Sequence, residues 1–320
     1  MPQLIDDFSP ARGLSNGHAQ TVFGSLWPKR ALALKRRRFE TPDGDFVDVD
    51  MLDGAPGTPT VLLCHGLEGS SSSKAIVELL RHLAALEWGA WALNFRSCSG
   101  EPNRLAASYS SGDTRDVTWL VPQMPTLRAI VGVSLGGSVV LNAMSQGLEV
   151  SAAAAISAPY QLRVCAQSLD SGRGFSPVYL RHFLPTMKAK ALEKAARFPR
   201  VLDAGLIRRA RTLRDFDQVV TAPAFGFASA EEYYERSSSG PKLSRIKTPT
   251  LLLSAEDDPL APAALLPVDV LNNPALHVLR TQHGGHVGWV AGSIRKPLFW
   301  AEHRVVRWLA QHFQQLGKKR

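Results

Sequence analysis

Short apolar runs that alternate with amphipathic stretches constrain the fold of this 320-residue chain more than any other feature. Apolar runs with few or no charges are typical of strands buried on both faces, as in parallel sheets. Six such runs lie at 60–64, 90–95, 129–133, 152–157, 250–254 and 277–280. Helical patterns separate most of them, at roughly 74–87, 113–121, 137–146 and 297–315. The alternation predicts an α/β protein with a mostly parallel central sheet flanked by helices.

A different pattern precedes the first of these runs. Two strand-like segments at 37–41 and 46–51 flank the sequence Pro-Asp-Gly-Asp at 42–45. An Asp-Gly pair between such segments favours a tight turn. We therefore expect a β-hairpin ahead of the parallel strands.

The interval from 160 to about 245 contains no strand pattern and is predicted to form several short helices with Pro and Gly breaks. It follows the run at 152–157, so it would lie at the carboxyl edge of the sheet, where α/β proteins bind ligands. The interval holds 15 basic and 8 acidic residues, a net charge of +7. We predict a single domain spanning 1–320, with this basic interval inserted as a helical lid.

The net charge of +9 raises the question of acidic partners. A solvated basic surface explains such a balance, and weak contact between the basic lid and an acidic membrane is the alternative. No RNA- or DNA-binding sequence pattern accompanies the basic residues, so no nucleic-acid partner is expected.

Three scattered cysteines, Cys64, Cys98 and Cys165, form neither a disulfide framework nor a metal-binding spacing, which favours a reducing compartment. The chain starts with acidic rather than basic residues, unlike a signal peptide. Its longest small-apolar stretch falls far short of the ~20 residues that span a bilayer. We therefore expect a cytoplasmic protein without a transmembrane segment.

The most informative motif is Gly-Val-Ser-Leu-Gly at 132–136, followed by Gly137. It fits the pattern G-x-S-x-G and stands between an apolar run and a helical pattern. In that setting the serine occupies a sharp strand-to-helix turn that lifts its hydroxyl above the sheet edge. The turn leaves no room for side chains beside it, which explains the glycines. Ser134 is the candidate nucleophile.

A serine hydroxyl needs a base within hydrogen-bond reach. The segment His-Gly-Gly-His-Val-Gly at 283–288 follows the last apolar run and offers His283 and His286. A carboxylate must hold the tautomer of that histidine and stabilise its protonated form. Asp257 and Asp258 both follow the run at 250–254. Spacing alone leaves both choices open.

Two backbone amides are candidates for binding the negative oxygen of a tetrahedral intermediate. One is the N–H of Leu135, directly after Ser134. The other is the N–H of Leu67, in the segment His-Gly-Leu-Glu-Gly at 65–69 after the first apolar run. Arg96, at the end of another strand, is expected to orient loops through backbone carbonyls or to bind an acidic group. Cys98 lacks an evident base beside it and is not expected to be a nucleophile.

Four of these segments, at 65–69, 94–103, 132–137 and 283–288, together resemble the AB hydrolase 4 family of YheT-like hydrolases. The sequence Asn-Gly-His-Ala-Gln-Thr near the N-terminus is also similar to that family. Ser97 stands where a glycine is expected. The resemblance implies the α/β-hydrolase fold and an esterase or acylglycerol-lipase-like activity that requires no cofactor and no metal.

The family pattern also implies a choice between the paired candidates. In α/β-hydrolases the base usually precedes the C-terminal helix, which selects His286. The strand-end pattern of that fold begins with Pro-Thr and ends in Gly-x-x-Asp-Pro. Setting its start on Pro249 and Thr250 puts Asp258 on the acid. The resemblance therefore implies a triad of Ser134, His286 and Asp258.

The leading hypothesis is a serine hydrolase that cleaves carboxylic esters with short or medium acyl chains through an acyl-enzyme. Its substrates would be small-molecule esters, including lipid-derived ones. A thioesterase or amidase with the same triad is the first alternative. A non-catalytic ligand-binding protein of the same fold is the second, because fold alone does not imply function.

Overall fold

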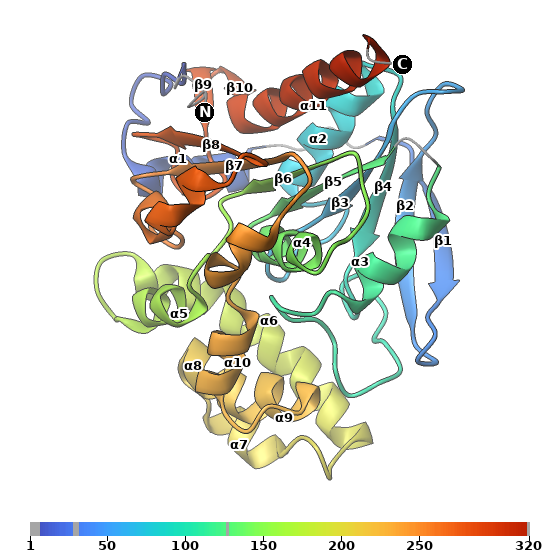
Figure 1. Ribbon diagram of the computed structural model, residues 1–320. Helices are drawn as coiled ribbons and strands as arrows, with labels where there is room; N and C mark the ends of the chain where they lie inside the picture. The colour runs from blue at the N-terminus through green and yellow to red at the C-terminus, as the bar shows by residue number, and fades with distance from the viewer. Residues whose placement is uncertain (1–6, 28–31, 126–127, 319–320) are drawn as a thin grey trace.

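The computed structural model describes residues 7–27, 32–125 and 128–318 (Figure 1). The first six residues of the acidic start, together with Lys319 and Arg320 of the basic tail, lie outside the described residues. Within the described ranges, no helix combines the length and the apolar character needed to cross a membrane.

An eight-stranded, mostly parallel sheet forms the centre of the molecule, as predicted. Its strand order is β1-β2-β4-β3-β5-β6-β7-β8. All pairs from β4 to β8 are parallel, whereas β1–β2 and β2–β4 are antiparallel. The strands are β1 (Lys35–Glu40), β2 (Phe46–Leu52), β3 (Thr60–Cys64), β4 (Gly89–Asn94), β5 (Arg128–Val133), β6 (Ala152–Ile156), β7 (Thr250–Ala255) and β8 (Leu276–Thr281).

Helices cover both faces of the sheet, so successive side chains of a central strand enter different core layers. In β3, Val61 and Leu63 pack with α2 (Lys74–Ala84) and α11 (Trp300–Lys318). Leu62 and Cys64 pack on the other face with α3 (Arg115–Leu120) and α4 (Leu135–Ser145). This double burial accounts for the continuous apolar runs in the sequence.

Two hairpins flank the parallel strands. The predicted one is confirmed: β1 pairs with β2, and Gly44 in the turn has φ +79°. The second, β9 (Val290–Ser293) with β10 (Lys296–Phe299), was not predicted. The expected helix start at 297 is therefore wrong, since α11 begins at Trp300. The helix start was placed too early because Phe299 fits the apolar spacing of residues 300–318. Its buried ring belongs instead to β10.

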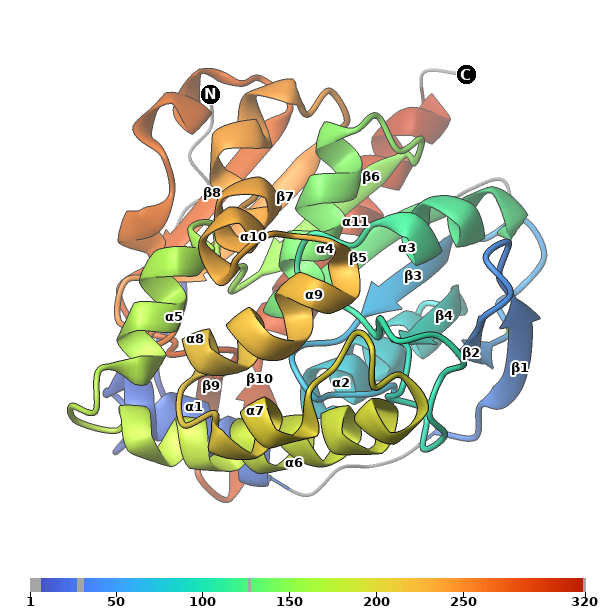
Figure 2. The same ribbon diagram turned by 90° about the horizontal axis from the view of Figure 1, so that it is seen from below.

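The interval after β6 is helical and without a strand, as predicted. Figure 2 shows its helices in front of the edge of the sheet. One of them, α6, is 22 residues long and passes through Pro185, so the prediction of only short helices is wrong. The helices are α5 (Leu162–Asp170), α6 (Ser176–Arg197), α7 (Ala204–Arg209), α8 (Leu213–Phe216), η2 (Asp217–Thr221), α9 (Ala222–Phe225), α10 (Ala230–Ser237) and η3 (Gly240–Arg245).

The remaining helices connect or cover the ends of the strands. They are α1 (Gly17–Leu26), η1 (Val121–Gln123), η4 (Ala263–Leu265) and η5 (Val268–Asn272). Helix α1 was not predicted as a helix. Asn16 caps it by accepting the backbone N–H groups of His18 and Ala19. Gly17 allows close approach, because a Cβ there would lie 2.0 Å from the carbonyl oxygen of Asp257.

Candidate active site

Ser134 occupies the sharp turn between β5 and α4. Its backbone has φ +54° and ψ −120°, a conformation that L-residues rarely adopt. The Ser134 N–H donates to the carbonyl oxygen of Ile156 at 2.8 Å. A Cβ on Gly132 would lie 2.2 Å from the Gly136 oxygen, and one on Gly136 would lie 2.3 Å from the Cys64 oxygen. The two glycines are therefore required by the close approach of three backbone segments.

His286 reaches this serine from the loop between β8 and β9. Its Nε2 lies 2.8 Å from Ser134 Oγ, and its side chain is 12% exposed. The His286 N–H donates to Thr21 Oγ1 of α1 at 2.8 Å. Gly285, at φ +59°, approaches so closely that a Cβ would lie 2.1 Å from the Gly17 oxygen. Helix α1 thus fixes the loop that carries the imidazole.

Asp258 lies on the other side of the imidazole and is fully buried. Its Oδ2 is 2.9 Å from His286 Nδ1. Its Oδ1 accepts the backbone N–H groups of Leu260 and Ala261, both at 2.8 Å. An ionised carboxylate accepts hydrogen bonds, so Nδ1 carries a proton and the Nε2 lone pair faces the serine hydroxyl.

The neighbouring pair of candidates lies in a different place. Asp257 Oδ2 is 3.4 Å from His283 Nδ1, and Asp257 Oδ1 accepts the Gly285 N–H at 2.8 Å. The His283 side chain is 43% exposed. The structure therefore brings together Ser134, His286 and Asp258, whereas Asp257 and His283 lie against the backbone of the loop and the solvent.

The loop after β3 packs directly against the serine. A Cβ on Gly66 would lie 3.2 Å from Ser134 Cβ. His65 Nε2 accepts the Phe95 N–H at 3.1 Å, so the proton on Nδ1 is donated to the Gly66 oxygen at 2.7 Å. Burial lowers the pKa of His65 to about 4, which keeps this imidazole neutral. Leu67 and Leu135, the two expected amide donors, both border the same cavity as Ser134.

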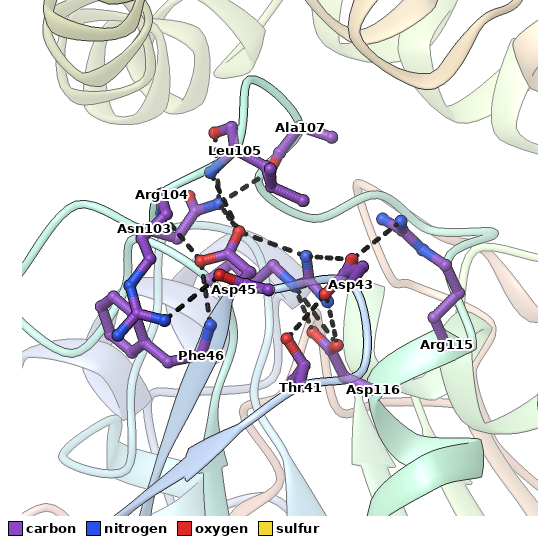
Figure 3. A network of polar contacts seen from close by, with 12 residues as sticks. Thr41, Asp43, Asp45, Phe46, Asn103, Arg104, Leu105, Ala107, Arg115 and Asp116 are labelled. Atoms are coloured by element: carbon purple, nitrogen blue, oxygen red, sulfur yellow. Dashed lines mark hydrogen bonds and ion pairs between the residues drawn. The ribbon is translucent and has the colours of Figure 1, made fainter.

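Arg96 is buried away from the serine and binds acidic side chains of its own chain. Its guanidinium contacts Asp43 at 2.8 Å, Asp45 at 3.2 Å and Asp116 at 2.6 Å. Figure 3 shows these three carboxylates converging from the β1–β2 turn and from α3. Arg96 therefore holds loops together, as expected, through carboxylates rather than backbone carbonyls. Burial raises the pKa of the nearby Cys98 thiol to about 11, which makes it a poor nucleophile.

A cavity of about 570 Å³ lies between the serine and the helices of the 162–245 segment. This volume falls within the roughly 300–1,000 Å³ of small-molecule sites. Its apolar walls come mainly from four elements of the segment, represented by Leu169, Met187, Phe216 and Val220. Within the described residues, no group of three or more His, Cys, Asp or Glu side chains is arranged to hold a metal ion.

Several polar residues at this cavity were not found from the sequence. They are Tyr109, Lys190, Lys194 and Asp217. Burial raises the pKa of Asp217 to about 7, although its carboxylate accepts hydrogen bonds from Thr221 and Tyr234. Burial also lowers the pKa of Lys194 to about 8. No short motif marks these residues, because their neighbours are distant in the chain.

Comparison with known proteins agrees with this arrangement of strands, turn and loops. A family model described as "alpha/beta hydrolase fold" matches residues 59–289. The chain belongs to the α/β-hydrolase family. YheT of Escherichia coli strain K12 is 36% identical to this hydrolase, over 96% of this chain and 94% of YheT. That similarity confirms the AB hydrolase 4 family indicated by the motifs.

Two further proteins show how far the similarity extends. Monoacylglycerol lipase of Saccharomyces cerevisiae is 30% identical, over 80% of this chain and 59% of the lipase. The solved structure of the Pyrococcus furiosus esterase Pf2001 superposes with a TM-score of 0.56 at 14% identity, covering 96% of this hydrolase and 98% of that chain. The second comparison supports the fold alone.

Proposed function

We propose that this protein is a carboxylic ester hydrolase in which Ser134, His286 and Asp258 form the catalytic triad. The observation that carries the proposal is the continuous contact from Asp258 Oδ2 through His286 to Ser134 Oγ, at 2.9 and 2.8 Å. The 2.8 Å contact is within reach for proton transfer from the hydroxyl to the imidazole, and the 2.9 Å contact lets Asp258 orient that imidazole. The similarity to a named monoacylglycerol lipase supports an ester as the substrate.

Ser134 Oγ attacks the ester carbonyl carbon while its proton passes to His286 Nε2. The carbonyl oxygen becomes negatively charged and accepts hydrogen bonds from the amides of Leu67 and Leu135. Asp258 stabilises the imidazolium that forms. His286 then donates its proton to the leaving alkoxide, and the products of this half-reaction are an alcohol and the acylated Ser134.

Water completes the cycle on the acyl-enzyme. His286 accepts a proton from the water as its oxygen attacks the acyl carbonyl carbon. Collapse of the second tetrahedral intermediate breaks the bond to Ser134 Oγ, which regains a proton from His286. The released product is a carboxylic acid. Each proton that leaves an oxygen thus returns to one, so these steps balance without a cofactor or metal.

The substrate class follows from the cavity and the segment that covers it. Apolar walls around about 570 Å³ suit a short or medium acyl chain, including that of a lipid-derived ester. The helices of 162–245 act as a lid inserted into a single hydrolase domain. Their net charge of +7 gives this lid a weak attraction to an acidic lipid surface.

A fluorophosphonate probe combined with p-nitrophenyl esters tests the proposal. The wild-type protein should become labelled, and Ser134→Ala should lose both labelling and ester turnover. Ser145→Ala is the matched control. Ser145 is the last residue of α4, the helix that follows Ser134, and its hydroxyl donates to the Asn142 carbonyl oxygen. Ester turnover that survives in Ser134→Ala would rule out this nucleophile.

A series of acyl lengths tests the substrate assignment. Turnover should be highest for short and medium acyl chains and should fall for long ones that exceed the cavity. Matched oxygen esters, thioesters and amides, compared by kcat/KM, should favour the oxygen ester. A clear preference for thioester or amide would leave the triad in place and assign a different bond to it.

A further inference from the structure

Helix α6 carries three basic side chains that point toward the body of the molecule. Lys190, Lys194 and Arg197 are spaced by four and three residues, so they share one face of the helix. The same face includes the buried residues Met187 and Ala191. Lys194 is buried and Lys190 is partly buried, whereas Arg197 is exposed at the edge of this face and donates to the Asn103 and Arg104 carbonyl oxygens.

Lys190 binds the loop that contains the proposed amide donor Leu67. Its Nζ lies 3.1 Å from Glu68 Oε1. The Tyr109 hydroxyl donates to the same carboxylate oxygen at 2.8 Å and accepts the Glu68 N–H at 2.9 Å. Glu68 has φ +54°, a left-handed conformation that is strained in a residue other than glycine. Tyr109 and Lys190 together hold the loop in this strained form.

Lys194 binds the segment that supplies Tyr109. Its Nζ donates to Asn103 Oδ1 and to the Leu105 carbonyl oxygen, both at 2.5 Å. The amide of Asn103 also donates to the Ala107 oxygen at 2.9 Å, two residues before Tyr109. Helix α6 is thus linked to Glu68 in two ways: directly by Lys190, and through Lys194, residues 103–109 and Tyr109.

The charge of Glu68 gives Lys190 a further role. The Glu68 carboxylate is only 10% exposed and follows Leu67 directly in the chain. A buried carboxylate without a cation would oppose the negative charge that develops on the substrate oxygen. The Lys190 ammonium compensates that charge from the side-chain end of Glu68, without contact to the backbone N–H of Leu67.

We propose that Lys190 is a positioning residue that, through Glu68 and Tyr109, sets the geometry and the electrostatic field of the oxyanion loop. The oxyanion hole then reaches its active geometry only when α6 is packed against the loop that contains Leu67 and Glu68. This inference rests on the proposed function, because it concerns the same catalytic step. It assigns to the helical segment a part in chemistry beyond that of covering the cavity.

Steady-state kinetics on a neutral p-nitrophenyl ester test this role. Lys190→Met should lower kcat about tenfold, less than the 10²–10³ of deleting an oxyanion donor, with KM changed less than about twofold. The second-order rate of fluorophosphonate labelling should fall by the same factor. Lys190→Arg retains a cation within reach of Glu68 and should recover most of the loss.

Lys188→Met is the matched control on the same helix. Its ammonium donates to the carbonyl oxygens of Arg208 and Ala210, both within the 162–245 segment, so kcat should stay near the wild-type value. Glu68→Gln removes the charge that Lys190 compensates. The double variant Lys190→Met/Glu68→Gln should therefore have a kcat close to that of Glu68→Gln alone.

Three results would overturn the assignment. One is an unchanged kcat in a folded Lys190→Met variant; another is an equal loss in Lys188→Met. The third is a rise in KM confined to anionic esters, which would make Lys190 a substrate-binding residue. If Lys190→Met fails to fold, the double variant Lys190→Met/Glu68→Gln replaces it, and a kcat far below that of Glu68→Gln alone overturns the assignment. The proposed function fails separately, through turnover in Ser134→Ala.

Discussion

Exchanging the two adjacent aspartates for asparagine separates their roles sharply. In Asp258, Oδ1 accepts two backbone N–H groups, from Leu260 and Ala261. The asparagine oxygen must take that place, since an amide NH₂ cannot accept. The NH₂ group then replaces Oδ2, which lies 2.9 Å from His286 Nδ1.

This arrangement reverses the tautomer of the base. An NH₂ donor requires Nδ1 of His286 to be an acceptor, so the proton moves to Nε2, which faces Ser134. Nε2 can then no longer accept the hydroxyl proton. Wrong-tautomer substitutions of this kind lower kcat about 10⁴-fold, which corresponds to roughly 5 kcal/mol in the activation free energy at 1.36 kcal/mol per decade.

Asp257→Asn should behave differently. Its carboxylate accepts the Gly285 N–H and faces the exposed His283, so the asparagine oxygen can keep the backbone contact. We expect kcat within a few-fold of wild type. The assay is kcat on a p-nitrophenyl ester together with thermal unfolding, which checks that both variants fold. An equal loss in the two variants, or a normal Asp258→Asn, would refute the reasoning.

Three further predictions concern packing and buried charge. Gly136→Ala should abolish fluorophosphonate labelling or soluble expression, because its Cβ would lie 2.3 Å from the Cys64 oxygen; Gly317→Ala, with nothing within 4 Å, should do neither. Burial raises the pKa of Glu302 from 4.5 to about 8, so folding binds a proton and stability is lost as pH rises through this window. Between pH 4.5 and 7 the free energy of unfolding of the wild type should fall by about 3 kcal/mol more than that of Glu302→Gln, at 1.36 kcal/mol per pH unit. Urea unfolding at the two pH values measures both changes. An equal change in the two proteins would contradict the prediction. Arg96→Lys should lower the free energy of unfolding by about 3 kcal/mol, because lysine cannot contact three carboxylates at once; an unchanged thermal midpoint would contradict this.

The sheet could be predicted because its signal is local. A strand buried on both faces must be apolar along its whole length, and β3 shows this in five consecutive buried residues. The turn at Ser134 could be predicted for a similar reason. Its glycines are required by the close approach of backbone atoms that lie only a few residues or one strand away. The β9–β10 hairpin was missed because its strands have four residues each, too few to show a period.

The choice between neighbouring candidates could not be made from local sequence. Which of two histidines meets Ser134 depends on how the loop at 283–288 is held, and the holding residue is Thr21, far away in the chain. The preference for Asp258 over Asp257 came from a resemblance to a strand-end pattern. In the structure the difference lies in the backbone donors of Leu260 and Ala261, which fix one carboxylate against the imidazole.

The positions of the basic residues in the 162–245 segment are a sequence signal that the net charge of the segment hides. The net charge of +7 gives the excess of basic over acidic residues in the segment and does not say where the basic side chains point. In α6, Lys190 and Lys194 continue the row of buried residues begun by Leu184 and Met187. A cation that falls on the apolar face of a helix needs a partner there, because burying it alone is costly. Periodicity applied to lysines as well as to leucines would have predicted that these two reach into the body of the hydrolase.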